Sequence, residues 1–157
     1  MPAKIRPYAP GDFNALCRMD AECYAPEIAY SRRTMRAFLR LPGAECQVAE
    51  EGGEIQGFIL TDRDGPAGHV ITLDVAPGGR RRGVGTALLE AAHGSLAMHG
   101  VREVELETST TNEAAVAFWK HHGYRACGVL SNYYENGEDA YWMTKTLGRA
   151  AAAPSGT

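Results

Sequence analysis

The segment from Val75 to Thr86 carries residue types that could bind a phosphorylated ligand. An apolar run ends at Val75, a turn rich in Gly and Pro follows, and three arginines precede Gly-Val-Gly and a long apolar stretch. A helix N-terminus attracts anions through its unpaired backbone N–H groups and its dipole. Glycine admits a ligand close to the main chain, and arginine donates charge-assisted hydrogen bonds to phosphate. The candidate ligand-binding residues are Arg80, Arg81, Arg82, Gly83, Val84, Gly85 and Thr86.

Other phosphate-binding patterns fit this segment poorly. A Rossmann site requires G-x-G-x-x-G and a Walker A loop requires Gly-Lys followed by Ser or Thr, and the segment has neither. A solvated arginine cluster beside an ordinary turn is the remaining alternative. The Gly-x-Gly spacing at a strand-to-helix junction favours the ligand site over that alternative.

Hydrophobic periodicity predicts the elements that position this turn. Alternating apolar residues indicate strands, and three- and four-residue spacings indicate helices. Asp12, Ser31 and Asn112 are residue types favoured at helix N-caps. Residues 108–111 are predicted as a polar loop. The predicted strands cover residues 4–8, 45–50, 55–61, 69–75, 101–107, 124–130 and 140–147, and the predicted helices begin at residues 12, 31, 83 and 112.

The order of these elements predicts an α/β fold, β-α-α-β-β-β-α-β-α-β-β, with a central mixed sheet and helices on both faces. The helix over 83–99 should join two parallel strands by a right-handed crossover. Residues 1–147 are predicted to form one domain, and residues 148–157, rich in Ala and carrying Pro-Ser-Gly, are predicted to be a disordered tail.

Composition restricts the class of protein. The 157 residues include 16 basic and 19 acidic ones, and the net charge of −3 argues against broad nucleic-acid binding. The four cysteines form no C-x-x-C pair, so neither a zinc site nor another metal site is predicted. No segment is long and apolar enough to cross a membrane, and the N-terminus lacks the apolar core of a signal peptide. A cytoplasmic protein with reduced thiols is expected.

These motifs together resemble the GNAT N-acetyltransferase superfamily. Its R/Q-x-x-G-x-G/A signature corresponds to residues 80–85, within a chain that has the superfamily's order of elements. A downstream motif, N-x-x-A-x-x-F/Y-x-x-x-G-F, is matched in part by Asn112, Ala115, Phe118, Gly123 and Tyr124. The resemblance covers about residues 3–147. The run Asn132-Tyr133-Tyr134, followed by Gly137-Glu138-Asp139-Ala140 and Met143, is most similar to ribosomal-protein alanine N-acetyltransferases (RimI-like).

The resemblance implies direct acetyl transfer from acetyl-CoA to a primary amine, with a protein or peptide N-terminus as the favoured acceptor. An enzyme for a small amine and a non-catalytic acyl-CoA sensor are the alternatives. In the superfamily a backbone N–H before the loop polarises the thioester, which points to Leu73, Asp74 and Val75. Asp74 itself is either exposed or lines the substrate site. The resemblance also places Asn112, Phe118 and Trp119 beside the cofactor.

The proton chemistry implied by the resemblance has three candidate residues. Glu107 matches the glutamate proposed as the base in RimI-like enzymes. His69 lies near the position at which related N-terminal acetyltransferases carry a catalytic tyrosine. The RimI-like general acid is a tyrosine at the position of Trp119, and indole does not release a proton at usable pH. Tyr134, or its neighbour Tyr133, is the predicted replacement, unless the thiolate leaves without an acid. The acidic segment 135–139 and Glu107 are expected to favour a cationic acceptor.

Overall fold

A computed structural model describes residues 3–80 and 83–148 and confirms the predicted order of elements. Arg81, Arg82 and the predicted tail after Gly148 lie outside these described residues. The strands are β1 (Lys4–Pro7), β2 (Glu45–Glu51), β3 (Glu54–Asp64), β4 (Ala67–Val75), β5 (Glu103–Ser109), β6 (Arg125–Leu130) and β7 (Ala140–Thr146). The helices are α1 (Phe13–Cys23), α2 (Arg32–Leu39), α3 (Val84–Met98) and α4 (Glu113–His121), with short 3-10 turns η1 (Pro10–Asp12) and η2 (Pro77–Gly79).

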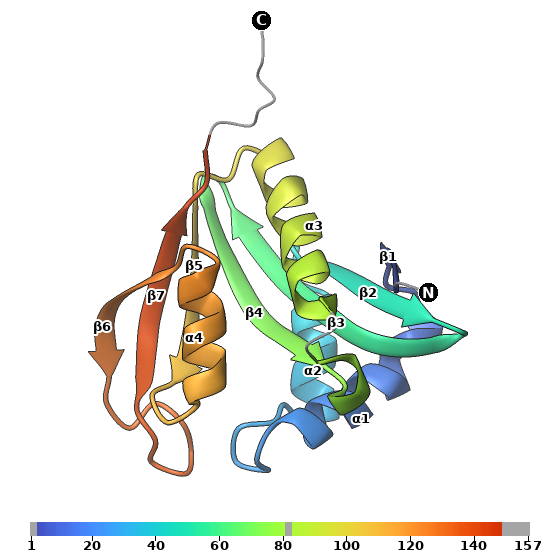
Figure 1. The fold of residues 1–157 in the computed structure, drawn as a ribbon, viewed down its shortest axis with the longest axis horizontal. Coiled ribbons are helices and arrows are strands. Elements are labelled where there is room, and N and C mark those ends of the chain that lie inside the picture. The colour runs from blue at the N-terminus through green and yellow to red at the C-terminus, as the bar shows by residue number, and fades with distance from the viewer. Residues whose placement is uncertain (1–2, 81–82, 149–157) are drawn as a thin grey trace, which may run out of the picture.

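The strands form one seven-stranded mixed sheet in the order β1-β2-β3-β4-β5-β7-β6. Strands β4 and β5 are parallel and are joined through α3, as the sequence predicts. Their register runs from Ala67 opposite Glu103 to His69 opposite Glu105. Beyond His69 the two strands separate, and Figure 1 shows them diverging toward α4 and the end of β4. The divergence leaves one edge of β4 open in the middle of the sheet.

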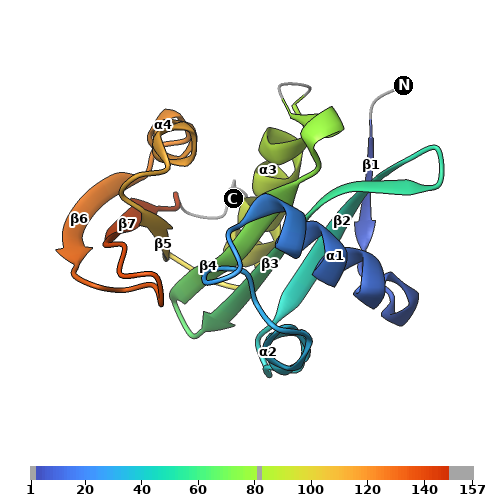
Figure 2. The same ribbon diagram turned by 90° about the horizontal axis from the view of Figure 1, so that it is seen from below.

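Helices cover both faces of the sheet, and each face has its own core (Figure 2). Helix α3 packs on β1 to β4, and α4 packs on β5 on the same face. Helices α1 and α2 cover the opposite face. Fully buried side chains include Leu88 and Leu106 in the first core, and Phe58 and Leu60 in the second.

A β-bulge in β4 changes which side chains face each layer. Thr61 pairs with Val70 and Leu60 pairs with Thr72, so Ile71 is an extra residue in β4. Val70 belongs to the α3 core before the bulge, whereas Leu73 and Val75 pack against that core after it. The alternation therefore shifts by one residue, which turns Thr72 and Asp74 toward α1.

Two local predictions are corrected by the structure. Thr108 and Ser109 extend β5 instead of starting a polar loop, because they pair with Tyr141 and Ala140 of β7. Asp12 is at the N-cap of α1 but makes no side-chain capping bond, since its carboxylate is paired with Arg6 at 2.8 Å. No helix within the described ranges is long and apolar enough to span a membrane.

Candidate active site

The turn between β4 and α3 places a left-handed glycine at the helix N-terminus. Gly83 has φ +82° at the N-cap of α3, a backbone conformation that residues other than glycine rarely adopt. A Cβ on Gly83 would meet no described atom within 4 Å, so the backbone conformation explains this glycine better than crowding does. Arg80 lies just before the turn, and its Nε donates to the carbonyl of Val75 at 3.1 Å.

The first turn of α3 packs against α4. A Cβ on Gly85 would lie 3.4 Å from the Phe118 ring and 3.5 Å from Val75, so glycine permits the close approach of the two helices. The Thr86 hydroxyl lies 3.1 Å from His122 Nε2. Asn112 caps α4, with its side-chain oxygen accepting from the Ala115 N–H at 3.1 Å. The described residues of the predicted ligand site thus gather where α3, α4 and β4 meet.

Side chains from α1 and the segment after it occupy the carbonyls on the open edge of β4. Tyr24 donates its hydroxyl to the carbonyl of Leu73 at 3.1 Å, and Tyr30 donates to that of Ile71 at 3.4 Å. A strand residue directs its N–H and C=O to the same edge. The N–H groups of Leu73 and Val75 therefore face the gap between β4 and β5, where they could donate to a ligand carbonyl.

The peptide group of Asp74 faces β3 by the same alternation, opposite Phe58. Its side chain is only 1% exposed, so the alternative of an exposed Asp74 is wrong.

His69 and Glu107 meet at the point where β4 and β5 separate. Nε2 of His69 and Oε1 of Glu107 are 2.8 Å apart, and their side chains are 37% and 20% exposed. Glu107 lies two residues beyond the last β4–β5 pair. Burial lowers the pKa of His69, but the Glu107 hydrogen bond and the negative charges of Glu107, Glu105 and Asp62 outweigh it, so the pKa is raised. The two base candidates are thus one hydrogen-bonded pair.

The segment between β6 and β7 brings tyrosines to this pair. The rings of Tyr133 and Tyr134 meet edge to face, with centroids 4.9 Å apart. Burial raises the pKa of Tyr134, and the nearby Tyr133, Tyr30 and Glu107 raise it further. Tyr30 is a site residue that sequence reasoning missed, because its segment between α1 and α2 carries no periodic signal. Its pKa is raised by burial first and then by Tyr133, Asp20, Glu107 and Asp74.

The Gly-Glu-Asp run holds that segment in place. Glu138 accepts hydrogen bonds from the hydroxyls of Ser109 and Thr111, and Asp139 accepts from the N–H of Asn132 at 2.9 Å. Asn132 itself has φ +52°. Glu138 and Asp139 therefore hold the segment that carries the tyrosines.

Trp119 lies in the α3 core and not in the gap between the strands. It is 7% exposed, and its ring packs edge to face on Phe118 at 5.1 Å and on Tyr124 at 5.3 Å between centroids. Phe118 is half-buried, and its ring lies against the start of α3 at Gly85. The structure thus gives Trp119 a packing role, whereas Phe118 lies beside Gly85.

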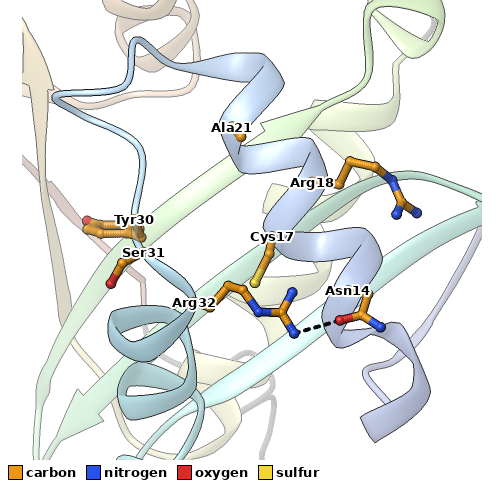
Figure 3. A pocket seen from close by; sticks show the side chains of 7 residues that line it. All are labelled: Asn14, Cys17, Arg18, Ala21, Tyr30, Ser31 and Arg32. Carbon is orange, nitrogen blue, oxygen red and sulfur yellow. Dashed lines mark hydrogen bonds between the residues drawn. The ribbon is translucent and has the colours of Figure 1, made fainter.

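A separate cavity of about 510 Å³ lies between α1 and the start of α2 (Figure 3). Of the described residues predicted for the site, none lines it. Figure 3 shows Arg32 reaching Asn14 across this cavity, and the hydrogen bond between them is 2.8 Å long. Its lining residues are Asn14, Cys17, Arg18, Ala21, Tyr30, Ser31 and Arg32.

Comparison with known proteins assigns the class. The Acetyltransferase (GNAT) family matches residues 13–124, so the chain belongs to the GNAT acetyltransferase family. An N-alpha-acetyltransferase of Sulfurisphaera tokodaii is 34% identical over 113 residues, which are 64% of this chain and 68% of that protein. An uncharacterized N-acetyltransferase of Methanocaldococcus jannaschii is 32% identical over 142 residues, 90% of each protein. The crystal structure of Ard1 from Thermoplasma volcanium has a TM-score of 0.85 at 26% identity, covering 94% of this chain and 99% of that one.

Proposed function

We propose that this protein transfers an acetyl group from acetyl-CoA directly to the N-terminal α-amine of a protein or peptide in the cytoplasm. The observation that carries the proposal is the His69–Glu107 pair, which lies at the point where β4 and β5 separate. Family membership supports the acetyl transfer, and the relative from Sulfurisphaera tokodaii, named an N-alpha-acetyltransferase, supports the acceptor. The four free cysteines agree with a reducing compartment.

The residues around the β4–α3 turn fit acetyl-CoA, which supplies an activated acetyl group as a thioester. The left-handed Gly83 is the N-cap of α3, and the N–H groups of the first helical turn have no partner within the helix and could bind an anion. The amides up to Thr86 are therefore the proposed pyrophosphate site. Arg80, Arg81 and Arg82 are proposed to add charge-assisted contacts to phosphate. The open-edge N–H groups of Leu73 and Val75 are proposed to polarise the acetyl carbonyl, where one preorganised donor contributes about 3 kcal/mol.

Glu107 is proposed as the base, with His69 as its proton outlet. An α-amine has an ordinary pKa near 8, so most of it is protonated at neutral pH and must lose a proton to become a nucleophile. Glu107 is the less exposed member of the pair, and His69 is the more exposed. In this scheme the proton leaves the ammonium for Glu107 and passes through His69 to water.

Tyr134 is the proposed proton donor to the departing thiolate. Its raised pKa keeps the phenol protonated at neutral pH. Its neighbours Tyr30 and Glu107 place it beside the His69–Glu107 pair. The position at which related enzymes carry an acid is filled by Trp119, whose indole is packed in the core. The proposal therefore moves the acid from α4 to the segment between β6 and β7.

The test compares peptides that carry free N-termini with small amines. Thiol release from acetyl-CoA is measured with a peptide panel, with the same peptides blocked at the N-terminus, and with polyamines and amino acids. The expected result is release with free peptides, none with blocked ones and little with small amines. Release with small amines alone would overturn the acceptor, and tight acetyl-CoA binding with no release would indicate a sensor.

A further inference from the structure

Two carboxylic acids meet in a sealed space between α1 and β4. Asp20 is 0% exposed and Asp74 is 1% exposed. One oxygen of each already accepts a hydrogen bond: Asp20 Oδ2 from the Tyr30 N–H at 2.7 Å, and Asp74 Oδ1 from the Thr72 hydroxyl at 2.6 Å. The other oxygens, Asp20 Oδ1 and Asp74 Oδ2, find no hydrogen-bond partner within residues 3–80 and 83–148. Buried polar atoms without partners are rare and require an explanation.

One proton held between the two carboxyl groups explains both unpaired oxygens. A protonated carboxyl donates to its neighbour, whereas two ionised carboxylates repel each other and lose hydration. Burial raises the pKa of Asp74 well above its ordinary value, and the hydrogen bond and negative charge of Asp20 raise it further. Thr72 and Arg80 act in the opposite direction and do not cancel these effects.

The other titratable groups around the pair do not replace that proton. Burial raises the pKa of each surrounding thiol and phenol, so these groups are neutral at physiological pH. Within residues 3–80 and 83–148, Arg80 is the cation that acts on the pair, and its guanidinium bonds the Val75 carbonyl and the Cys23 sulfur. The neighbours are Cys23 of α1, Tyr24 and Tyr30 in the segment after it, Cys46 of β2, and Arg80 after η2.

We propose that Asp20 and Asp74 share one proton and that the shared proton holds the segment between α1 and α2 on the open edge of β4. Asp20 binds the N–H of Tyr30, and the Tyr30 hydroxyl binds the carbonyl of Ile71, so the pair positions Tyr30 beside Glu107 and Tyr134. Asp20 and Asp74 are therefore positioning residues. This role rests on the proposed function, since it assigns Tyr30 to the wall of the amine site. Loss of the proton at higher pH puts two negative charges in contact and loosens that wall.

The first test measures the unfolding equilibrium as a function of pH. The folded protein keeps a proton that the unfolded chain releases above about pH 4, so rising pH favours unfolding. The unfolding constant of the wild type, relative to that of Asp74→Asn, should rise about tenfold per pH unit until the pair ionises. Asp20→Asn is a second variant in which a neutral amide replaces the shared proton, and it should behave alike. Asp64→Asn, at an exposed position on β3, is the control and should keep the wild-type slope. Equal slopes in all variants would overturn the proposal.

The second test detects the proton directly. An infrared difference spectrum should show a protonated-carboxyl C=O band in the wild type at neutral pH, and Asp74→Asn should lack it. Amide hydrogen exchange at Tyr30 should accelerate as that band disappears with rising pH, relative to Asp74→Asn at the same pH. Absence of the band, or identical exchange in both proteins, would overturn the inference.

A third readout separates a positioning role from a purely structural one. The kcat/KM for the peptide should decline over the pH range in which the infrared band disappears, and this decline should be missing in Asp74→Asn. An unchanged decline would refute the positioning role. The unfolding and infrared readouts do not depend on acetyl transfer. An inactive protein with a normal infrared band would therefore contradict the proposed function but support the shared proton.

Discussion

Two pairs of titratable side chains lie along β4, and the pairs differ in their access to water. His69 and Glu107 meet at the open gap with side chains 37% and 20% exposed, whereas Asp20 and Asp74 are at most 1% exposed. Glu107 has an imidazole partner and nearby solvent, so a proton on this pair can leave. Asp74 has another carboxyl as its partner, so a proton there is retained. In the proposed scheme the same strand serves proton transfer at one position and positioning at another.

The bulge at Ile71 places the two pairs on the same face of the sheet. It shifts the alternation of β4 between His69 and Asp74, so both side chains lie on the α1 side of the sheet, opposite the α3 core that contains Val70. Without the extra residue, Asp74 would share a face with Val70 in the α3 core. The inserted residue therefore brings Asp74 to Asp20 of α1, whereas the separation of β4 and β5 opens the His69–Glu107 pair to water.

The largest expected effect tests the open pair. Glu107→Gln removes the base while keeping the shape of the side chain, and kcat should fall by about 10²- to 10⁴-fold. The Kd for acetyl-CoA should stay close to that of the wild type. Initial rates and isothermal titration calorimetry measure the two quantities. Glu103→Gln, on the exposed start of the same strand, is the matched control. An unchanged kcat would remove Glu107 as the base.

The next effect tests the sealed pair. Asp20→Ala leaves the N–H of Tyr30 and one oxygen of Asp74, Oδ2, without a partner in a space closed to water. The free energy of unfolding should fall by about 3 kcal/mol, since each unsatisfied buried group costs about 1–3 kcal/mol. Urea denaturation measures this loss. The exposed control Asp64→Ala should stay within about 0.5 kcal/mol, and a similarly small loss for Asp20→Ala would mean that the pair does not anchor the segment between α1 and α2.

A smaller effect concerns the acid beside the open pair. Tyr134→Phe removes the phenol hydroxyl and keeps the ring, so kcat should fall by about tenfold to a hundredfold, at the low end for a general acid because thiolate is a good leaving group. Tyr133→Phe, the exposed ring neighbour, should have the weaker effect. Steady-state rates at saturating acetyl-CoA compare the two. The reverse order of effects would assign the acid to Tyr133.

The smallest effect compares how the two pairs depend on pH. Since the pKa of His69 is raised in the folded state, its contribution to stability is present below about pH 6.5 and is lost as the pH rises through the folded value. The exposed position of the pair screens it, so the wild type and His69→Gln should differ by less than about 1 kcal/mol. Unfolding curves across this range measure the difference. For Asp74 the decline begins lower, near pH 4. A decline for Asp74 that begins only near pH 6.5, as for His69, would contradict the distinction between the two pairs.

Local signals in the sequence predicted the elements and their ends well. Ser31 and Asn112 cap α2 and α4 through the N–H groups of Thr34 and Ala115, as their residue types indicate. The Gly-x-Gly triplet begins α3, and its first glycine is left-handed. These features depend on neighbours within one helical turn, so the residue order suffices. Asp12 failed as a capping side chain because Arg6, on a neighbouring element, competes for its carboxylate.

Resemblance to a family named Glu107 and His69 separately, and only the fold joined them. They are 38 residues apart, and their contact depends on the register of β4 against β5. Tyr30 and Asp20 gave no chemical signal, because their roles come from packing against β4. The orientation of Asp74 could not be predicted, since alternation assumes an unbroken ladder and the bulge at Ile71 breaks it.

The sequence by itself determined the order of elements, the glycine-rich turn that precedes α3 and the family. The tertiary structure decided which side chains share a space and which of those spaces water reaches. The physical reason is that patterns of residues report the face of an element, whereas register, bulges and strand separation set the distances on which proton chemistry depends.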